Sequence, residues 1–248
     1  MSEIWIDHLS IDGWQEPGVW TDYLEQAQTI LGATLTHLDA NDPVKRKVAL
    51  LKDAGEYVCA FNPREDSRWV FGKFDAIGVE LSIHHHRQLG HSPNSLKWHV
   101  PLSFIDTPES FARLKALFDL GNQTFKPFYA YGDDVTHIKS KKKLSGAVDI
   151  QAELLGVYWM TYFNAAYVTF FGEDKFNEFP GVRYGDDGSV MTLLGDSPKS
   201  VSKELRERLA SALGSQSFVN SSDVLGKLPG RFALTFQQLL AANKHLTN

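Results

Sequence analysis

The stretch ELLGVYWMTYFNAAYVTFFGEDKFNEFP, residues Glu153–Pro180, is among the most apolar and aromatic parts of the chain. Its first half is rich in the bulky side chains that favour a pleated, buried surface, so we expect a central strand over Leu155–Phe163. The segment Ala165–Phe171 fits either a short helix or a strand, and Gly172 favours the helix because glycine commonly ends one. The core is therefore expected to assemble around this stretch.

Before this stretch, the sequence changes from a helical to a strand pattern. Apolar residues recur at helical spacing over Val19–Leu31, and Gly32 is placed to end that helix. The residues Asn41-Asp42-Pro43 predict the start of a second helix that runs to about Leu51. Short turns between the strands that follow favour an antiparallel meander. These expected strands are Tyr57–Phe61, Trp69–Phe74, Ile77–His84 and Lys97–Phe104.

Two Thr/Ser-Pro pairs mark the starts of further helices. Thr107 has the character of an N-cap before Pro108, and Gly121 is placed to end this helix. Ser197-Pro198 predicts a helix in which apolar residues recur every fourth position as far as Gly214. The other elements that we expect are strands over Phe125–Tyr131, Ser189–Leu194 and Arg231–Leu234 and a helix over Phe236–Leu246. This order predicts an α+β fold, a mainly antiparallel sheet with helices packed on it.

The length of 248 residues suits one large domain or two small ones. We expect a single α+β domain over residues 1–248, with a subdivision near 135–150 as the alternative. Each half places strands before a helix that begins with a Thr/Ser-Pro pair, so two similar α+β halves are a further interpretation.

Composition narrows the class of protein. The net charge of -5 argues against a nucleic-acid-binding protein, whose domain normally has a basic face, and we interpret the basic run Lys139–Lys143 as a solvated loop. Cys59 is the one cysteine, so we expect neither an intramolecular disulfide nor a thiolate metal site. No run approaches the ~18 apolar residues that cross a bilayer, and MSEIWIDHLS lacks the apolar segment of a signal peptide. A cytoplasmic protein with no membrane or direct nucleic-acid partner is therefore expected.

Histidines are the sharpest candidates for catalytic chemistry. His84 and His86 share one face of an expected strand, and a neighbouring strand that brought His99 beside them would create a site for zinc or iron. This group has no clear carboxylate partner, and solvated histidines are the alternative. We interpret Cys59, in an expected apolar strand, as a buried and inert thiol. The sequence contains no phosphate-binding glycine motif, and we expect no cofactor.

Acidic residues stand next to aromatic residues at several predicted turns. Such a composition suits an interface with a basic protein, because charges steer the encounter and aromatic side chains anchor the complex. The alternative is that Asp-Asp-Gly and Gly-Asp-Asp are ordinary turns. The residues assigned to this interface are Tyr129, Tyr131, Asp133, Asp134, Glu173, Asp174, Phe176, Glu178, Tyr184, Asp186 and Asp187.

The run LLGVYWMTYFNAAYVTFFGEDKFNEFP and the later VMTLLGDSP resemble the immunity protein 52 family of bacterial polymorphic toxin systems. The segment WHVPLSFIDTPESFARLKALFDLGNQTFKPFYAYGDD is similar to the same family, and the resemblance spans roughly Trp69–Pro198. It implies a non-enzymatic antitoxin that binds a cognate toxin, typically a nuclease effector of a type VI secretion system (T6SS). The family offers no catalytic residue to carry over to this chain.

The sequence thus predicts an immunity protein that neutralises a secreted toxin by direct binding, and not an enzyme. Two alternatives stay open. One is a metal-dependent enzyme that uses His84, His86 and His99, and the other is a chaperone that binds an effector without blocking its activity.

Overall fold

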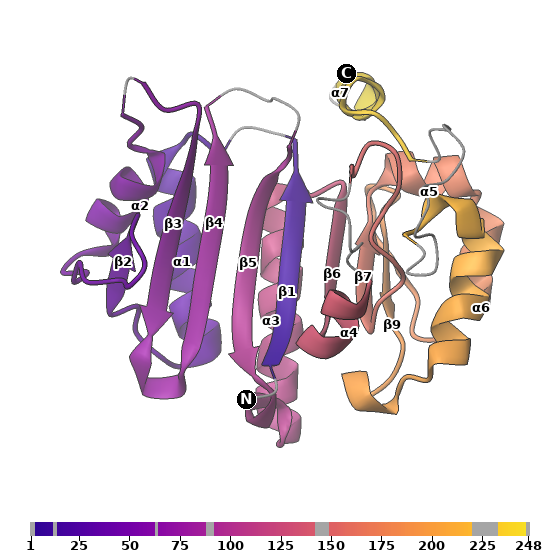
Figure 1. Cartoon of the computed structure of the whole chain (residues 1–248), viewed down its shortest axis with the longest axis horizontal. Coiled ribbons are helices and arrows are strands. Elements are labelled where there is room, and N and C mark those ends of the chain that lie inside the picture. The colour runs from indigo at the N-terminus through magenta and orange to yellow at the C-terminus, as the bar shows by residue number, and fades with distance from the viewer. Residues whose placement is uncertain are drawn as a thin grey trace. The chain divides into compact units, whose positions relative to one another are not determined.

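The computed structural model describes residues 3–11, 14–62, 64–87, 92–141, 149–219 and 233–246. The chain divides into two compact units, Met1–Pro127 and Phe128–Asn248, and each unit is described by itself. Both combine antiparallel strands with helices, so the α+β class predicted from the sequence is confirmed (Figure 1). The single-domain organisation stays a prediction.

In the part of the N-terminal unit that the structure describes, five strands are hydrogen-bonded in the order β2-β3-β4-β5-β1, and each neighbouring pair is antiparallel. The strands β3, β4 and β5 follow one another along the chain, which confirms the predicted meander. The strand bounds are β1 Glu3–Ser10, β2 His37–Asp39, β3 Ser67–Phe74, β4 Val79–His86 and β5 Asn94–Pro101.

Helices α1 (Pro17–Leu31) and α3 (Pro108–Phe125) cover one face of this sheet, and α2 (Leu51–Cys59) packs beside α1 (Figure 1). The short 3-10 helices η1 (Asp75–Ile77) and η2 (Leu102–Ile105) follow β3 and β5. None of the described helices of this unit lies on the opposite face, which is turned toward the viewer in Figure 1.

Aromatic rings fill the space between the helices and the sheet. The rings of Trp20 and Phe125 lie 4.6 Å apart between centroids, and Trp98 Nε1 donates a hydrogen bond to the Tyr23 hydroxyl at 2.9 Å. All four side chains are buried. Each fully buried side chain of this size contributes roughly 1.5–3 kcal/mol through removal of apolar area from water.

The predicted end of α1 and the predicted start and end of α3 can be compared with the structure. Gly32 ends α1 with φ 64°, and the Thr107 hydroxyl accepts a hydrogen bond from the Ser110 N–H at 3.1 Å to cap α3, as predicted. The predicted end of α3 at Gly121 is wrong, because the helix continues to Phe125. Gly121 instead allows α3 to approach β1, since an added Cβ would lie 2.4 Å from His8 Nε2.

The predicted helix from Asn41-Asp42-Pro43 to Leu51 is also wrong. The Asp39 carboxylate accepts hydrogen bonds from the N–H groups of Asn41, Lys45 and Arg46 at 3.1, 3.2 and 3.2 Å, which holds this segment as a loop. Helix α2 begins only at Leu51, and it includes Tyr57–Cys59 of the strand that we expected over Tyr57–Phe61.

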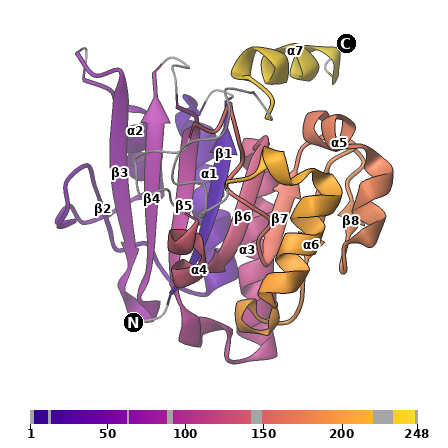
Figure 2. The ribbon, with the colours of Figure 1, turned by 45° about the vertical axis from the view of Figure 1, so that its right-hand side comes forward.

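The described residues of the C-terminal unit form four strands in the order β6-β7-β9-β8, with each neighbouring pair antiparallel. Their bounds are β6 Tyr129–Asp134, β7 Met160–Phe163, β8 Arg183–Tyr184 and β9 Val190–Leu193. The helices are α4 Val135–Ser140, α5 Ala165–Phe171, α6 Lys203–Leu213 and α7 Phe236–Leu246, with 3-10 helices η3 Glu173–Glu178, η4 Pro198–Ser200 and η5 Ser215–Ser217. The turned view in Figure 2 separates these helices.

The first half of the stretch Glu153–Pro180 lies in the buried centre of this unit, but its strand is shorter than predicted. Only Met160–Phe163 pairs as a strand. The Tyr158 N–H donates to the Thr161 hydroxyl at 2.9 Å, and that hydroxyl lies 3.1 Å from the Tyr158 carbonyl oxygen, so the chain turns before β7. The helix α5 is confirmed, with the Asn164 side chain as its cap and Gly172 at φ 95° after it.

Other bounds also differ from the predicted ones. The strand expected over Ile77–His84 is β4, which starts after η1, and the strand expected over Lys97–Phe104 is β5, which starts at Asn94 and ends before η2. The strand expected over Phe125–Tyr131 is observed as β6, which begins later, at Tyr129, because α3 continues to Phe125. Ser197-Pro198 begins the short η4, and α6 starts after Ser202, whose hydroxyl accepts the Leu205 N–H at 3.1 Å. Of the strand expected over 231–234, residues 231 and 232 lie outside the described part, and Ala233 and Leu234 are not in a strand.

Candidate functional site

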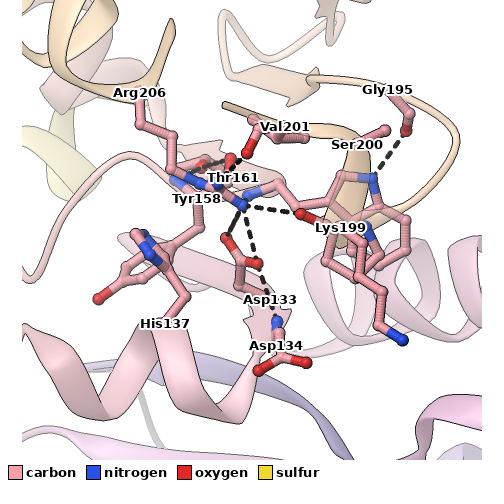
Figure 3. A network of polar contacts seen from close by, with 12 residues as sticks. Asp133, Asp134, His137, Tyr158, Thr161, Gly195, Lys199, Ser200, Val201 and Arg206 are labelled. Atoms are coloured by element: carbon pink, nitrogen blue, oxygen red, sulfur yellow. Dashed lines mark hydrogen bonds and ion pairs between the residues drawn. The ribbon is translucent and has the colours of Figure 1, made fainter. Parts of the chain in front are cut away.

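A buried ion pair connects β6 to α6 (Figure 3). The two Asp133 carboxylate oxygens accept hydrogen bonds from Arg206 Nη2 at 3.0 and 2.8 Å. They also accept the backbone N–H groups of Asp134 at 2.8 Å and Trp159 at 2.9 Å. Arg206 in turn donates to the backbone carbonyls of Val201 and Pro198. One charge pair therefore joins β6, the segment before β7 and the start of α6.

The Asp133–Arg206 pair is buried, which indicates a structural role and not a contact with a partner. The Asp133 side chain is 0% exposed and the Arg206 side chain 8%. Burial raises the pKa of the Asp133 carboxyl to about 6, and the Arg206 guanidinium and the two backbone N–H groups oppose that rise. Asp134 caps α4, because its Oδ1 accepts the Thr136 N–H at 2.7 Å. Both acids of the predicted Asp133-Asp134 contact site thus have structural roles.

Several aromatic residues of the predicted interface also lie in the interior. Tyr129, Tyr131 and Phe176 are 0%, 3% and 0% exposed. The Tyr129 hydroxyl donates to the Gly156 carbonyl at 2.6 Å, and the Tyr131 ring stacks on Tyr158 with centroids 4.8 Å apart. These side chains and Asp133 therefore do not contribute to the exposed surface of this unit.

The other predicted interface residues form an exposed group that we name the acidic edge. It lies on η3, on the edge strand β8 and on the turn that follows, and α5 and β8 are seen at the same side of this unit in Figure 2. The Tyr184 side chain is 45% exposed, and its hydroxyl donates to Asn177 Oδ1 at 3.2 Å, which links β8 to η3. The acidic edge consists of Glu173, Asp174, Glu178, Tyr184, Asp186 and Asp187.

The acidic edge combines charge with apolar area. Phe170, at the end of α5 just before η3, is 43% exposed. Part of the edge is also an ordinary turn, because Asp187 Oδ1 accepts the Ser189 N–H at 3.0 Å and Gly188 has φ 77°. Asp187 therefore holds the turn, while the carboxylates of Glu173, Asp174, Glu178 and Asp186 are exposed.

The three histidines of the alternative metal site do not converge. His84 and His86 lie side by side on β4, with ring centroids 4.3 Å apart. His99 lies on β5 opposite Glu80, and its ring packs against Trp5 at 5.1 Å. Across the described ranges, no group of three or more His, Cys, Asp or Glu side chains is placed to hold a metal ion.

His84 belongs instead to an aromatic row on the face of the N-terminal sheet that none of the described helices of this unit covers. Its ring is stacked on Trp69, with centroids 4.3 Å apart and planes 4° from parallel, and Trp69 stacks in turn on Phe71 at 6.0 Å. The Trp69 side chain is 45% exposed. Sequence analysis missed this row, because only the register that places Trp69 opposite His84 brings the rings together.

Histidine burial predicts a dependence of stability on pH. Burial, with smaller contributions from neighbouring charges, lowers the pKa of His85 from 6.5 to about 4, and this residue is 0% exposed. Between these values the unfolded chain binds a proton that the folded chain does not, so His85 lowers stability as the pH falls below 6.5. The expected loss from His85 at pH 5 is about 2 kcal/mol.

Urea unfolding at pH 7 and pH 5 measures this effect. The loss of unfolding free energy between the two pH values should be about 2 kcal/mol smaller in His85→Leu than in the unsubstituted protein. Because both proteins share their other titrating groups, those contributions cancel in the comparison. Equal losses in the two proteins would contradict the prediction.

Cys59 ends α2, so the strand context predicted for it is wrong. Its thiol is half-buried and lies 3.5 Å from the Trp14 carbonyl oxygen, to which it donates. Burial raises the pKa of this thiol to about 11. Such a thiol is a poor nucleophile, since the thiolate is the reactive form.

Comparison with known proteins identifies the fold. No protein-family model matches the chain, and no curated protein matches it. A solved structure, described as the Pseudomonas aeruginosa T6SS protein PA0821, superposes with a TM-score of 0.59 at 13% sequence identity. The match covers 100% of this chain and 85% of that one, so the two proteins share a fold over the whole length of this chain. No helix within the described ranges has the length and apolar character needed to span a membrane.

Proposed function

We propose that the chain is a T6SS-associated immunity protein that neutralises a cognate effector by binding it directly. The observation that carries this proposal is the fold that the whole chain shares with a T6SS protein. The resemblance of Trp69–Pro198 to the immunity protein 52 family supports the same role, and its finer assignment to that family is part of the proposal. A role in the cytoplasm follows from the proposed function if the effector is a nuclease, because its nucleic-acid substrate is there.

The acidic edge is the surface that we assign to the effector. Two exposed aromatic side chains, Phe170 and Tyr184, accompany the exposed carboxylates there. Nucleases bind phosphates through basic residues, so a nuclease effector presents a surface of the opposite charge. An immunity protein docked on that surface would exclude the nucleic acid.

Co-expression tests the function. The product of the gene next to this one is expressed in a bacterium with and without the chain, growth is measured, and the two proteins are then co-purified. Rescue of growth together with a stable complex supports an immunity protein. A complex without rescue supports the chaperone alternative, and toxicity with neither rescue nor a complex would falsify both.

A charge-matched pair of variants tests the surface. The variant Glu173→Gln/Asp174→Asn/Glu178→Gln/Asp186→Asn removes four exposed charges and leaves Asp187 to hold its turn. We expect it to bind the effector at least about tenfold more weakly and with a flatter dependence on salt, because steering charges are lost. Affinity is measured by calorimetry at two salt concentrations.

The control variant removes the same number of exposed charges from the N-terminal unit, with Asp22→Asn/Glu25→Gln/Asp53→Asn/Glu56→Gln. Its affinity should stay within about twofold of that of the unsubstituted protein, a difference of less than about 0.5 kcal/mol. Equal weakening by both variants would mean that net charge, and not the acidic edge, governs binding.

A further inference from the structure

The face of the N-terminal sheet opposite α1 and α3, which we name the aromatic face, is turned toward the viewer in Figure 1. The side chains that β3 and β4 direct to this face include Trp69, Phe71, His84 and His86, since the residues that alternate with them are buried. A sheet face that meets only water is normally polar, whereas aromatic residues are enriched in protein–protein interfaces. The aromatic face therefore has the composition of a surface that a protein partner covers.

Lysines on the aromatic face are paired within it. Lys73 Nζ lies 3.3 Å from Glu80 Oε1, and Lys97 Nζ lies 3.2 Å from Asp7 Oδ2. Paired lysines do not supply the excess positive charge that binding of a nucleic acid needs. The partner is therefore expected to present both signs of charge together with apolar area, as this face itself does.

The register of β3 and β4 makes the aromatic face complementary to itself. In this register Lys73 is opposite Glu80, and Trp69 is opposite His84. A two-fold axis parallel to the two strands and midway between them places β3 of one copy over β4 of a second copy. Lys73 then lies over Glu80 of the second copy and Trp69 over His84 of the second copy, and symmetry repeats both contacts.

Both contacts are favourable. The side chains of Lys73 and Glu80 are 31% and 53% exposed, so each can meet the opposite charge of a second copy while it keeps its own pair. Burial and neighbouring charges lower the pKa of His84 to about 4, so its imidazole is uncharged at neutral pH and can be covered without burying a charge. The acidic edge offers no such match, because its carboxylates would meet like charges in a second copy.

We propose that the chain self-associates through the aromatic face, as a two-fold dimer in which β3 and β4 of one copy pack on β4 and β3 of the other. Strands β3, β4 and β5 are eight residues long, so the overlap covers on the order of 500 Å² per copy. This area is below the roughly 800 Å² per partner of a standard interface, so we expect a micromolar dissociation constant. The dimer does not require the effector, so the proposal goes beyond the proposed function.

Sedimentation of the full chain over a range of concentrations tests the dimer. We expect a monomer–dimer equilibrium with a dissociation constant of about 10–100 µM, which Trp69→Ala raises at least about tenfold by removing an aromatic anchor. A chain that stays monomeric up to about 500 µM, or a dimer that Trp69→Ala does not weaken, overturns the proposal. Loss of effector binding in Trp69→Ala with an unchanged dimer would mean that the effector covers this face, which also overturns it.

Charge reversal tests the two-fold arrangement itself. Lys73→Glu and Glu80→Lys, each alone, should raise the dissociation constant at least about tenfold, because like charges then meet across the axis. An equal mixture of the two variants should form a heterodimer with at least the affinity of the unsubstituted chain, because opposite charges meet again. If the mixture does not associate, the proposed arrangement is wrong.

Matched reversals on η3 supply the control. Lys175→Glu and Glu178→Lys change the net charge by the same amounts but lie outside the aromatic face. Each should leave the dissociation constant within about twofold of that of the unsubstituted chain. If they weaken the dimer as much as Lys73→Glu and Glu80→Lys do, net charge and not the aromatic face governs self-association, and the proposal fails.

Discussion

Asp133→Asn is expected to lower the free energy of unfolding of the C-terminal unit by about 3–5 kcal/mol, since it leaves a buried charge without its partner. The Arg206 side chain is only 8% exposed, so water can solvate its charge only in small part. Asparagine keeps only one acceptor oxygen, so its NH2 group must face donors, Arg206 and either the Asp134 N–H or the Trp159 N–H. Urea unfolding followed by circular dichroism measures the loss.

The neighbouring acid gives a matched control. Asp134→Asn makes the same chemical change one residue later, and asparagine caps a helix about as well as aspartate, so a loss below about 0.5 kcal/mol is expected. The double variant Asp133→Leu/Arg206→Met should be more stable than the sum of its single changes implies, because no charge is left unpaired. A loss below about 1 kcal/mol in Asp133→Asn would show that the pair does not hold this unit together.

Gly121→Ala is expected to destabilise the N-terminal unit by about 1–3 kcal/mol, although alanine is the better helix former by about 1 kcal/mol. The added Cβ would lie 2.4, 2.6 and 2.8 Å from three atoms of the His8 ring. That ring is fully buried and is held by a 3.1 Å contact of Nε2 with the Phe118 carbonyl. Helix α3 must therefore move away from β1.

A second helix glycine supplies the comparison. Gly18 lies in α1, where an added Cβ would meet nothing within 4 Å, so Gly18→Ala should be neutral or stabilising by up to about 1 kcal/mol. Adding His8→Ala to Gly121→Ala should cause less loss than the sum of the two single changes, since the ring is the obstacle. Stabilisation by Gly121→Ala alone would contradict the close approach. The stabilities of Gly121→Ala, Gly18→Ala, His8→Ala and the double variant are measured by thermal unfolding.

Local signals predicted those parts of the fold that depend on neighbours in sequence. The cap at Thr107, the glycine after α1 and the helix Ala165–Phe171 were confirmed, because each depends on hydrogen bonds within a few residues. Elements that depend on distant contacts were misjudged. Gly121 has the sequence signature of a helix end, but its role is set by His8 on another element.

The candidate site shows the same limit. The acids and aromatics of the predicted interface were chosen by composition, and composition does not distinguish a carboxylate that pairs with Arg206 from one that faces water. Asp133 and Arg206 are 73 residues apart in the chain, and nothing local to either indicates the pair. The stacking of Trp69 on His84 likewise depends on the pairing register of β3 and β4.

The position of Cys59 also makes the chain convenient for spectroscopic labelling. With a pKa of about 11, only about one thiol in ten thousand is ionised at neutral pH. A cysteine introduced at an exposed position such as Asp174 or Asp186 has an ordinary thiol and should react with maleimide dyes far faster than Cys59. Single fluorophores can therefore be placed along the acidic edge of the otherwise native chain, and docking of an effector can be followed in real time.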